Sequence, residues 1–435
     1  MQPTIDSGNT AWILTSTALV LLMTPGLAFF YGGLVRGKNV LNTMMMSIIA
    51  MGVVAIQWAV LGYSLSFAEG NSFIGGLGFF GLENVGAAPV EGMTIPHYAF
   101  MAFQMMFAVI TPALISGAVV ERMKFKAYVF FILAWAVCVY DPLCHWVWGG
   151  GWIADLGALD FAGGTVVHVS AGVSALVAAL ILGRRSSLIA DEESRAHNVP
   201  FVLLGAALLW FGWFGFNAGS ALAADGIAAL AIVTTNLAAA AAMIIWVALD
   251  VWKGRRPSAV GAATGAVVGL VTITPAAGFV TPMGAIAMGL LGALVAFTAI
   301  ERLGRLGIDD TLDVFACHGV GGIVGSILTG VFATKAVNSG GADGLLYGGG
   351  AELLIAQTIS VLAAAAFAGG CTAVILIAMK AMMGIRANSE LEDQGLDLGD
   401  HGEAAYPLES PARLLHVSPP IAPQIADTHS VTGSD

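Results

Sequence analysis

Long apolar runs follow one another along almost the whole chain, separated by short polar or glycine-rich segments. A helix that crosses a bilayer needs about 20 predominantly apolar residues, and these runs have roughly that length. The sequence lacks the alternating segments of about ten residues that are typical of a membrane β-barrel. The pattern therefore predicts an all-α polytopic membrane protein. The expected spans are 11–34, 41–67, 97–120, 127–147, 161–183, 200–219, 227–250, 259–275, 282–300, 314–334 and 351–379.

The basic residues fall almost entirely in alternate loops. Sixteen of the 17 Lys and Arg residues follow an odd-numbered span, and only Lys335 follows an even-numbered one. Because short basic loops stay on the cytoplasmic side, we expect the N-terminus outside and the C-terminus inside. An even number of spans would put a basic cluster on the wrong face, so the charges favour eleven transmembrane helices. The glycine-rich loop 69–96, which has no Lys or Arg, is expected outside.

Composition divides the chain into a transmembrane domain, residues 1–380, and a cytoplasmic tail, residues 381–435. The chain is only 10% charged, whereas soluble domains are about one quarter charged. The tail is hydrophilic and acidic and accounts for much of the net charge of −11, which argues against a nucleic-acid partner. Its Pro/Ser/Ala-rich distal part is expected to be disordered. No basic segment precedes the first apolar run, so a cleavable signal either does not exist or has been removed.

Two pairs of similar segments indicate an internal repeat. The segment Pro25–Gly33 (PGLAFFYGG) in the first span echoes Phe211–Gly219 (FGWFGFNAG) in the sixth. A histidine followed by glycines in the fifth span is echoed in the tenth. Repeats of five spans must have opposite orientations, because five is odd. We therefore expect a 5+5 inverted repeat plus a final helix, with the functional site near the midplane between the halves.

The segment Asp160–Gly172 (DFAGGTVVHVSAG) carries a histidine, His168, deep in an apolar run, and His318 lies in another such run. A polar residue at membrane depth is costly and marks a candidate functional site. Three interpretations are open. The histidines form helix–helix hydrogen bonds, or they ligate a haem, or they line a polar row that suits a small neutral molecule. The nearby glycines favour tight packing and so disfavour a haem. The four cysteines lack the paired spacing of a metal site.

Asp160 and a set of aromatic residues each allow two interpretations. Asp160 begins a span, where it either caps the helix or attracts a cation to an external vestibule. The aromatic residues cluster at or just within the expected outer span ends, where they form either an interfacial belt or a cation–π vestibule. They are Phe103, Phe107, Trp146, Trp148, Trp213 and Phe216.

Four of these segments together resemble the signature of the ammonium transporter (Amt/Mep/Rh) family. They are Pro25–Asn39, Asp160–Gly172, Phe211–Ser220 and Cys317–Gly319. The likeness covers residues 8–406, and it looks closest to the bacterial AmtB-like branch. It implies a homotrimer in the bacterial inner membrane, with one pore per subunit and eleven helices arranged as an inverted repeat.

The resemblance also implies roles for individual residues, carried over by motif. Trp148, Phe107 and Ser220 match the outer ammonium-recruitment site, which Asp160 supports. Phe107 and Phe216 match a stacked phenyl gate. His168 and His318 match a twin-histidine pore, and Trp213 matches a residue that lines it. No catalytic residue, cofactor or metal is expected, and the chain is not expected to be an enzyme.

The proximal tail resembles the cytoplasmic C-terminal region of the family. The match covers Gly384–Arg386 and Gly395–Tyr406, whereas 387–394 is a looser match. In bacterial members this region contacts a neighbouring subunit and helps to dock a PII-type signal protein that closes the pore. The matching residues are Gly395, Asp397, Asp400, His401, Gly402 and Tyr406.

The expected function is ammonium uptake. Ammonium, or its analogue methylammonium, is drawn to the outer site, loses a proton near the gate, and crosses as ammonia past the twin histidines. Three alternatives remain open at this stage: a neutral channel for ammonia or carbon dioxide, an ammonium sensor that acts through its tail, and a membrane haem protein.

Overall fold

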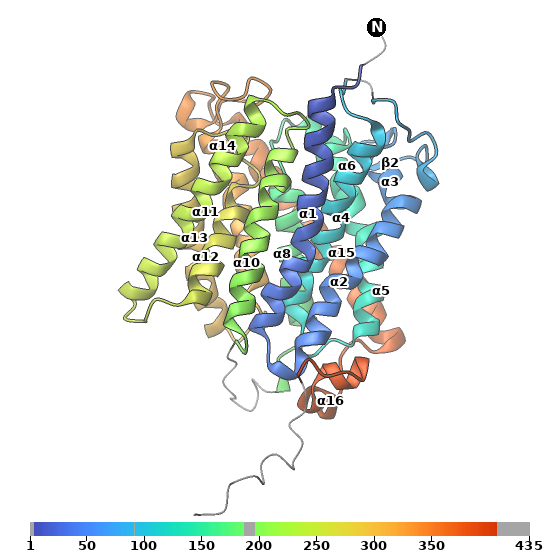
Figure 1. Cartoon of the computed structure of the whole chain (residues 1–435), viewed down its shortest axis with the longest axis vertical. Coiled ribbons are helices and arrows are strands. Elements are labelled where there is room, and N and C mark those ends of the chain that lie inside the picture. Colours follow the sequence, from blue (N-terminus) through green and yellow to red (C-terminus); the bar gives the residue numbers. More distant parts are fainter. Residues whose placement is uncertain (1–3, 91, 187–195, 407–435) are drawn as a thin grey trace, which may run out of the picture.

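The computed structural model describes residues 4–90, 92–186 and 196–406. In this part of the chain, long helices run side by side between two opposite faces of the molecule (Figure 1). The N-terminus lies at one end, which we call the N-terminal face. Residues 384–406 lie at the other end, which we call the tail face (Figure 1). Because the two ends of the described chain lie on opposite faces, the polypeptide passes between them an odd number of times.

The helices agree closely with the predicted spans, and ten of those in the described residues are long and apolar enough to cross a membrane. The shorter helix α12 has 15 residues, which corresponds to about 22 Å against about 30 Å of hydrocarbon. The count of eleven therefore stays a prediction. The helices are α1 (Ser7–Leu34), η1 (Gly37–Asn39), α2 (Val40–Gln57), η2 (Trp58–Gly62), α3 (Tyr63–Phe67), η3 (Phe80–Leu82), α4 (His97–Val119), α5 (Phe125–Trp135), η4 (Ala136–Tyr140), α6 (Asp141–Trp148), α7 (Trp152–Asp155), η5 (Gly164–Val169), α8 (Ser170–Leu182), α10 (Val199–Trp213), η6 (Phe214–Ala218), α11 (Gly226–Trp252), α12 (Ala259–Ile273), α13 (Pro282–Arg305), η7 (Phe315–Val320), α14 (Gly321–Phe332), η8 (Leu345–Tyr347), α15 (Glu352–Met383), α16 (Ser389–Gln394) and η9 (Asp397–His401).

Two helices extend four or five residues beyond the predicted ends of their spans. The prediction ended α13 at residue 300 and α15 at residue 379, but they continue to Arg305 and Met383. Hydropathy marks where the apolar run stops, whereas the backbone hydrogen bonds continue into the polar turn. In α13 this extension carries Glu301, which pairs with Lys253 at 2.9 Å and with Arg255 at 2.8 Å.

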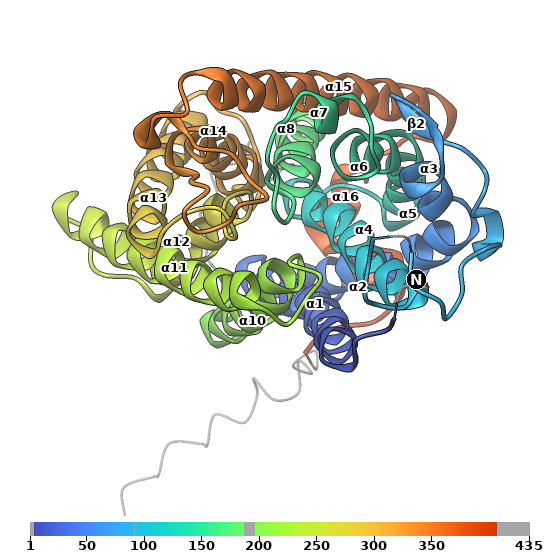
Figure 2. The ribbon, with the colours of Figure 1, turned by 90° about the horizontal axis from the view of Figure 1, so that it is seen from above.

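Glycines allow the two expected halves to approach closely. The first helix, α1, packs along α10, the first helix of the second half. A Cβ on Gly205 would lie 2.2 Å from the backbone nitrogen of Phe30, and one on Gly212 would lie 2.3 Å from Cγ of Met23. Only glycine fits at such contacts. Helix α15 lies along one side of the bundle, outside α8 and α14 (Figure 2).

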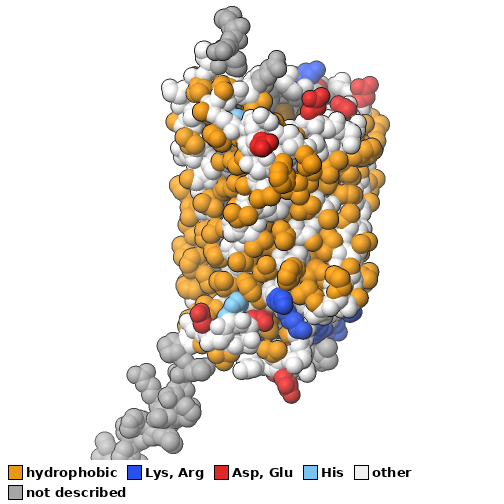
Figure 3. Space-filling view, turned by 90° about the vertical axis from the view of Figure 1, so that its right-hand side faces the viewer, with side chains coloured by type: hydrophobic (Ala, Val, Ile, Leu, Met, Phe, Trp, Pro, Cys, Tyr) orange, Lys and Arg blue, Asp and Glu red, His pale blue; other side chains and the backbone are white. Residues whose placement is uncertain are grey.

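A small antiparallel hairpin and the long loop after it cover part of the N-terminal face. Its strands are β1 (Gly70–Asn71) and β2 (Ile74–Gly75). On the face shown in Figure 3, hydrophobic side chains form a broad band across the middle of the molecule, and charged side chains lie above and below it. On the face shown, the basic side chains gather mainly toward the tail face. The apolar band suits the hydrocarbon core of a bilayer.

Candidate functional site

A cavity of about 450 Å³ opens on the N-terminal face. It brings together four residues that the sequence predicted to act together, although they come from separate segments: Phe107, Trp148, Asp160 and Ser220. Trp148 is held in place because its indole N–H donates to the backbone oxygen of Asp160 at 2.9 Å. The Ser220 hydroxyl donates to the Phe216 carbonyl at 2.8 Å. Aromatic faces and a hydroxyl in such a cavity can replace part of the hydration shell of a small cation.

Two stacked phenyl rings form the floor of this cavity. The rings of Phe107 and Phe216 lie 4.2 Å apart at 28°, and each side chain is 1% exposed. Phe103 and Trp148 pack edge-on against Phe107. The aromatic side chains therefore pack against one another inside the bundle. An interfacial belt alone would not require this packing.

Asp160 accepts four backbone hydrogen bonds. Its carboxylate oxygens receive the N–H groups of Gly163, Gly164, Thr165 and Val166 at 2.6–3.2 Å. This geometry is that of a helix cap, in which a carboxylate satisfies the otherwise unpaired donors of the first turn. Asp160 also lines the cavity. Its carboxylate can therefore cap the helix and at the same time exert an electrostatic field on a cation in the cavity.

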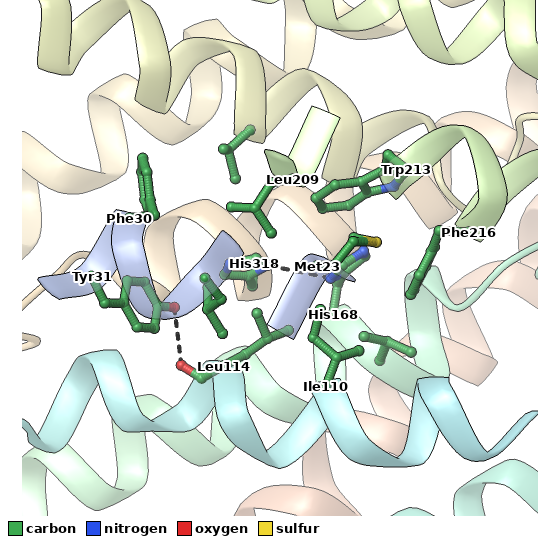
Figure 4. Close-up of a pocket in the computed structure, with 13 residues that line it drawn as sticks. Met23, Phe30, Tyr31, Ile110, Leu114, His168, Leu209, Trp213, Phe216 and His318 are labelled. Atoms are coloured by element: carbon green, nitrogen blue, oxygen red, sulfur yellow. Dashed lines mark hydrogen bonds between the residues drawn. The ribbon is translucent and has the colours of Figure 1, made fainter. Parts of the chain in front are cut away.

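The two histidines meet directly beyond the phenyl rings. Their Nδ1 atoms lie 3.3 Å apart, and the rings are nearly parallel, with centroids 5.3 Å apart (Figure 4). For two neutral imidazoles this contact requires one Nδ1 to donate and the other to accept. His168 also stacks on Trp213 at 5.5 Å, whose indole N–H donates to Thr274 Oγ1 at 2.9 Å. Nε2 of His168 is buried and has no partner among the described residues.

Close backbone contacts and π-helical turns set this geometry. His168 lies in the π-helical segment η5 and His318 in η7. Such turns are rare and frequently occur at functional sites. A Cβ on Gly172 would lie 2.1 Å from the backbone nitrogen of Gly319, and one on Gly322 would lie 2.9 Å from Cβ of His168. The missing side chains thus let the two helices approach until their imidazoles touch.

The histidines border a narrow, mostly apolar void of about 10 Å³. This is the volume of about one water-sized molecule. The void and the direct contact of the Nδ1 atoms leave no slot for a porphyrin between the rings, so the geometry disfavours the haem interpretation. The residues that line the void are Met23, Leu27, Phe30, Tyr31, Ile110, Leu114, Val167, His168, Leu209, Trp213, Phe216, Val267 and His318 (Figure 4).

A second large cavity, of about 330 Å³, follows on the side of the tail face. It shares Phe30, Tyr31, Val267 and His318 with the narrow void. Three compartments therefore follow one another, and the narrowest is the one that the histidines line.

The comparisons agree with this arrangement. A family model described as the Ammonium Transporter Family matches residues 11–406. The chain belongs to this family. An ammonium transporter of Bacillus subtilis is 51% identical over 92% of this chain and 99% of the relative. One of Aquifex aeolicus is 48% identical over 93% of this chain and 94% of the relative. The bacterial relatives agree with the branch that the motifs indicated.

Solved structures of the ammonium transporter family have the same fold. Mep2 of Saccharomyces cerevisiae superimposes with a TM-score of 0.83 and 38% identity, covering 89% of this chain and 91% of the other. A sensor Amt protein superimposes with a TM-score of 0.83 and 29% identity, covering 91% and 98%.

In this family member the proximal tail packs onto the tail face of its own chain. Asp397 accepts the backbone N–H of Asn42 at 2.8 Å, and Asp400 accepts that of Phe125 at 2.9 Å. The His401 ring packs edge-on against Phe125 at 4.7 Å. The Tyr406 hydroxyl meets Nε2 of His197 at 2.9 Å. Gly395 and Gly402, with φ of 104° and 67°, supply the left-handed turns between these contacts.

A buried ion-pair network lies on the same face. Glu121 binds Arg185 at 2.6 Å and Arg36 at 3.1 Å, and Arg185 also binds Asp309 at 3.0 Å. Burial alone would raise the pKa of Glu121, but the guanidinium groups of Arg185 and Arg36 lower that pKa to about 2. Arg36 and Arg185 are among the basic residues that predicted the topology, whereas no role was predicted for Glu121 or Asp309.

Sequence reasoning also missed Asp310, which caps the turn before His318. Its carboxylate accepts the backbone N–H of Phe315 at 2.6 Å. Asp310 precedes His318 by the same eight residues that separate Asp160 from His168. This equal spacing in the two expected repeats is the signal that could have identified it.

Proposed function

We propose that this chain transports ammonium across a membrane, with ammonia as the species that passes the narrow void. The narrow void is the observation that supports this proposal best. Two facing imidazoles line it, and stacked phenyl rings separate it from the outer cavity. Trp148, Phe107 and Ser220 recruit ammonium in the outer cavity, with the support of Asp160. Phe107 and Phe216 act as the gate, and His168, His318 and Trp213 line the pore.

Desolvation supports a change of charge at the gate. A void with room for about one water molecule cannot hold a hydration shell, and an unpaired ion in apolar surroundings is very costly. Ammonium can avoid this cost by giving up a proton, whereas potassium cannot. The edges of the two imidazoles then offer hydrogen bonds to ammonia along the passage. A neutral channel for ammonia or carbon dioxide would move no charge. Measurements of electrical current therefore distinguish such a channel from a transporter that moves charge.

The distribution of charge supports an orientation with the tail face in the cytoplasm. The N-terminal face, with the 450 Å³ cavity, is then the outer face. In this proposal the chain is a homotrimer in the bacterial inner membrane. Residues 1–380 form the transport domain, and the tail from residue 381 is regulatory. Gly395, Asp397, Asp400, His401, Gly402 and Tyr406 shape the surface that a PII-type protein docks on.

The experiment compares the wild type with the double variant His168→Ala/His318→Ala in proteoliposomes, under a controlled membrane potential. We expect one of two results. Either the ammonium and methylammonium flux falls by about tenfold, because two polar contacts in the passage are lost, or potassium begins to leak. The outer-loop variant Lys335→Ala serves as a control and keeps its flux. If the double variant leaves both the ammonium flux and the exclusion of potassium unchanged, the mechanism is wrong.

A sensor is the second candidate function. Two observations favour it: the likeness to a sensor Amt protein, and the tail that packs against the ends of the helices. A sensor would bind ammonium in the outer cavity without measurable flux. Ammonium binding in detergent together with absent flux in vesicles would support the sensor over the transporter.

A further inference from the structure

A buried carboxyl group without an assigned role lies at the start of α6, the helix that ends at Trp148. This group belongs to Asp141, which is fully buried, and it meets Gln57 on α2, which is 6% exposed. The Gln57 amide donates from Nε2 to Asp141 Oδ2 at 2.7 Å. Asp141 Oδ1 and Gln57 Oε1 have no hydrogen-bond partner among the described residues. The contact thus leaves one unpartnered oxygen on each side chain.

The two unpartnered oxygens lie next to the same small space. A Cβ on Gly62 would lie 2.9 Å from Asp141 Oδ1, 3.0 Å from Gln57 Oε1 and 2.7 Å from Gln57 Nε2. A side chain at this position would therefore collide with the pair. The oxygens of an ionised carboxylate and of an amide are both acceptors, so neither can satisfy the other. A protonated carboxyl group has an O–H that can donate to the amide oxygen.

The surroundings of Asp141 favour a neutral acid over an ion. The only partner of its side chain in the described structure is the uncharged Gln57 amide. A carboxylate that is taken out of water without a counter-charge is costly, and such a group takes up a proton instead. Asp160 differs because four backbone N–H groups stabilise its carboxylate. Asp141 has no comparable set of donors.

The pair joins two helices at irregular turns near the outer cavity. Gln57 precedes the π-helical turn η2, and Asp141 follows the π-helical turn η4. Helix α6 has 8 residues from Asp141 to Trp148, which corresponds to about 12 Å. Trp148 lines the outer cavity. Between them, Trp146 donates its indole N–H to the Phe73 carbonyl at 2.7 Å. A displacement at the first residue of this short helix is therefore passed on to Trp148.

We propose that Asp141 is a protonated carboxylic acid that pairs in both directions with the Gln57 amide, and that it is a positioning residue for Trp148 at the outer ammonium site. The O–H at Oδ1 donates to Gln57 Oε1, while Gln57 Nε2 donates to Oδ2. This closed pair holds the start of α6 against the end of α2. The protonation state follows from the geometry alone, whereas the effect on Trp148 rests on the proposed function.

Infrared difference spectroscopy tests the protonation state. The measurement compares the wild type with Asp141→Asn in proteoliposomes at neutral pH. A protonated carboxyl group has a C=O stretching band that is separate from the bands of a carboxylate. We expect Asp141→Asn to lose a protonated-carboxyl band and no carboxylate band. Asp155→Asn is the matched control, because Asp155 is exposed, and it should lose a carboxylate band only. Loss of a carboxylate band in Asp141→Asn overturns the inference.

Transport kinetics in the same vesicles test the positioning role. The Asn amide can both donate to Gln57 and accept from it, so Asp141→Asn keeps the half-saturating ammonium concentration within about twofold of the wild type. Leu has a similar size but forms no hydrogen bond. We therefore expect Asp141→Leu to raise this concentration about fivefold, the effect of losing one hydrogen bond. The maximal flux should stay within about twofold, because the narrow void is unchanged. Asp155→Asn changes neither value.

The removal of the other partner supplies an independent variant. Gln57→Leu should raise the half-saturating concentration as Asp141→Leu does, and it serves if Asp141→Leu fails to fold. An equal rise in Asp141→Asn and Asp141→Leu overturns the inference, because the group would then act as an ion. Unchanged half-saturation in both Leu variants, or a fall in maximal flux alone, overturns the positioning role. A wild type without ammonium flux overturns the proposed function and the positioning role together, whereas the infrared spectra decide the protonation state separately.

Discussion

At the scale of single residues, specific partners stabilise several of the charged groups that the bundle buries. Asp160 receives four N–H groups, and Glu121 receives two arginines. A buried charge without such partners costs several kcal/mol. Asp313 is different because its carboxylate faces a cavity and has no partner in the described structure.

The capping role of Asp160 leads to a prediction. Asp160→Ala leaves four N–H groups without an acceptor, so we expect it to destabilise the protein by at least about 2 kcal/mol. Asp160→Asn keeps one acceptor oxygen and should lose less stability. Thermal unfolding in detergent measures both variants, with Asp155→Ala as an exposed control. Equal stability of Asp160→Ala and the wild type would contradict the capping role. If Asp160→Asn keeps its stability but loses ammonium uptake, the carboxylate acts on the ion as well.

The lowered pKa of Glu121 predicts an acid-sensitive fold. The folded-state pKa of about 2 lies below the ordinary value of 4.5, so the network stabilises the folded state fully above about pH 4.5 and loses this stabilisation as the pH falls toward 2. Glu121→Gln removes the titrating group. We expect the variant to be less stable at pH 7, with a smaller further loss between pH 5 and pH 3 than the wild type. Parallel unfolding curves at these pH values would refute this assignment.

At the scale of elements, three helices change to a π-helical turn where the pore residues lie. Phe216, His168 and His318 lie in η6, η5 and η7. Glycines on the facing helices then allow contact at backbone distance. The path is therefore built from irregular turns inside regular helices, and its geometry depends on the packing of α8 against η7.

A single methyl group should disrupt this packing. In Gly172→Ala the new Cβ would lie 2.1 Å from the backbone nitrogen of Gly319, so the helices must separate. We expect a loss of about 1–3 kcal/mol in stability and of most of the ammonium flux. Gly370→Ala is the matched control, since its Cβ would meet nothing within 4 Å; its stability should stay equal or rise. Normal flux in Gly172→Ala would show that the close contact does not position the histidines.

At the scale of the whole molecule, the two faces differ in charge and in covering. The hairpin lies at the N-terminal face, and residues 384–406 of the tail lie at the tail face (Figure 1). The 450 Å³ cavity opens on the N-terminal face. The tail accepts hydrogen bonds from the first residue of α5, Phe125, and from Asn42 near the start of α2. A partner that binds the tail can therefore act on the ends of two helices at once.

The orientation can be tested by labelling. In a variant whose four cysteines are replaced by alanine, Glu83→Cys and Lys126→Cys place one thiol on each face. The positive-inside distribution predicts that an impermeant maleimide labels Glu83→Cys on intact cells, and Lys126→Cys only after permeabilisation. The cysteine-free protein is the unlabelled control. The reverse pattern would overturn the proposed orientation.

Much of the architecture could be predicted because its signals are local. The ten long spans follow from apolar run length, and the family follows from motifs such as Asp160–Gly172. The residues Phe107, Trp148 and Ser220 could be grouped only through the family resemblance, since nothing in their spacing shows that they share a cavity. Asp310 was missed because a carboxylate in a loop before a span looks like an ordinary polar boundary residue.

The sequence by itself determined which segments enter a membrane, how the charges sort between the two faces, and to which family the chain belongs. These properties depend on composition and on order along the chain. Only the tertiary structure decided that His168 and His318 touch at 3.3 Å, that Asp160 caps a turn, and that Asp313 faces a cavity without a partner. The contact between the two histidines joins residues that are 150 positions apart. It is set by how closely glycine-bearing helices approach, which no local pattern encodes.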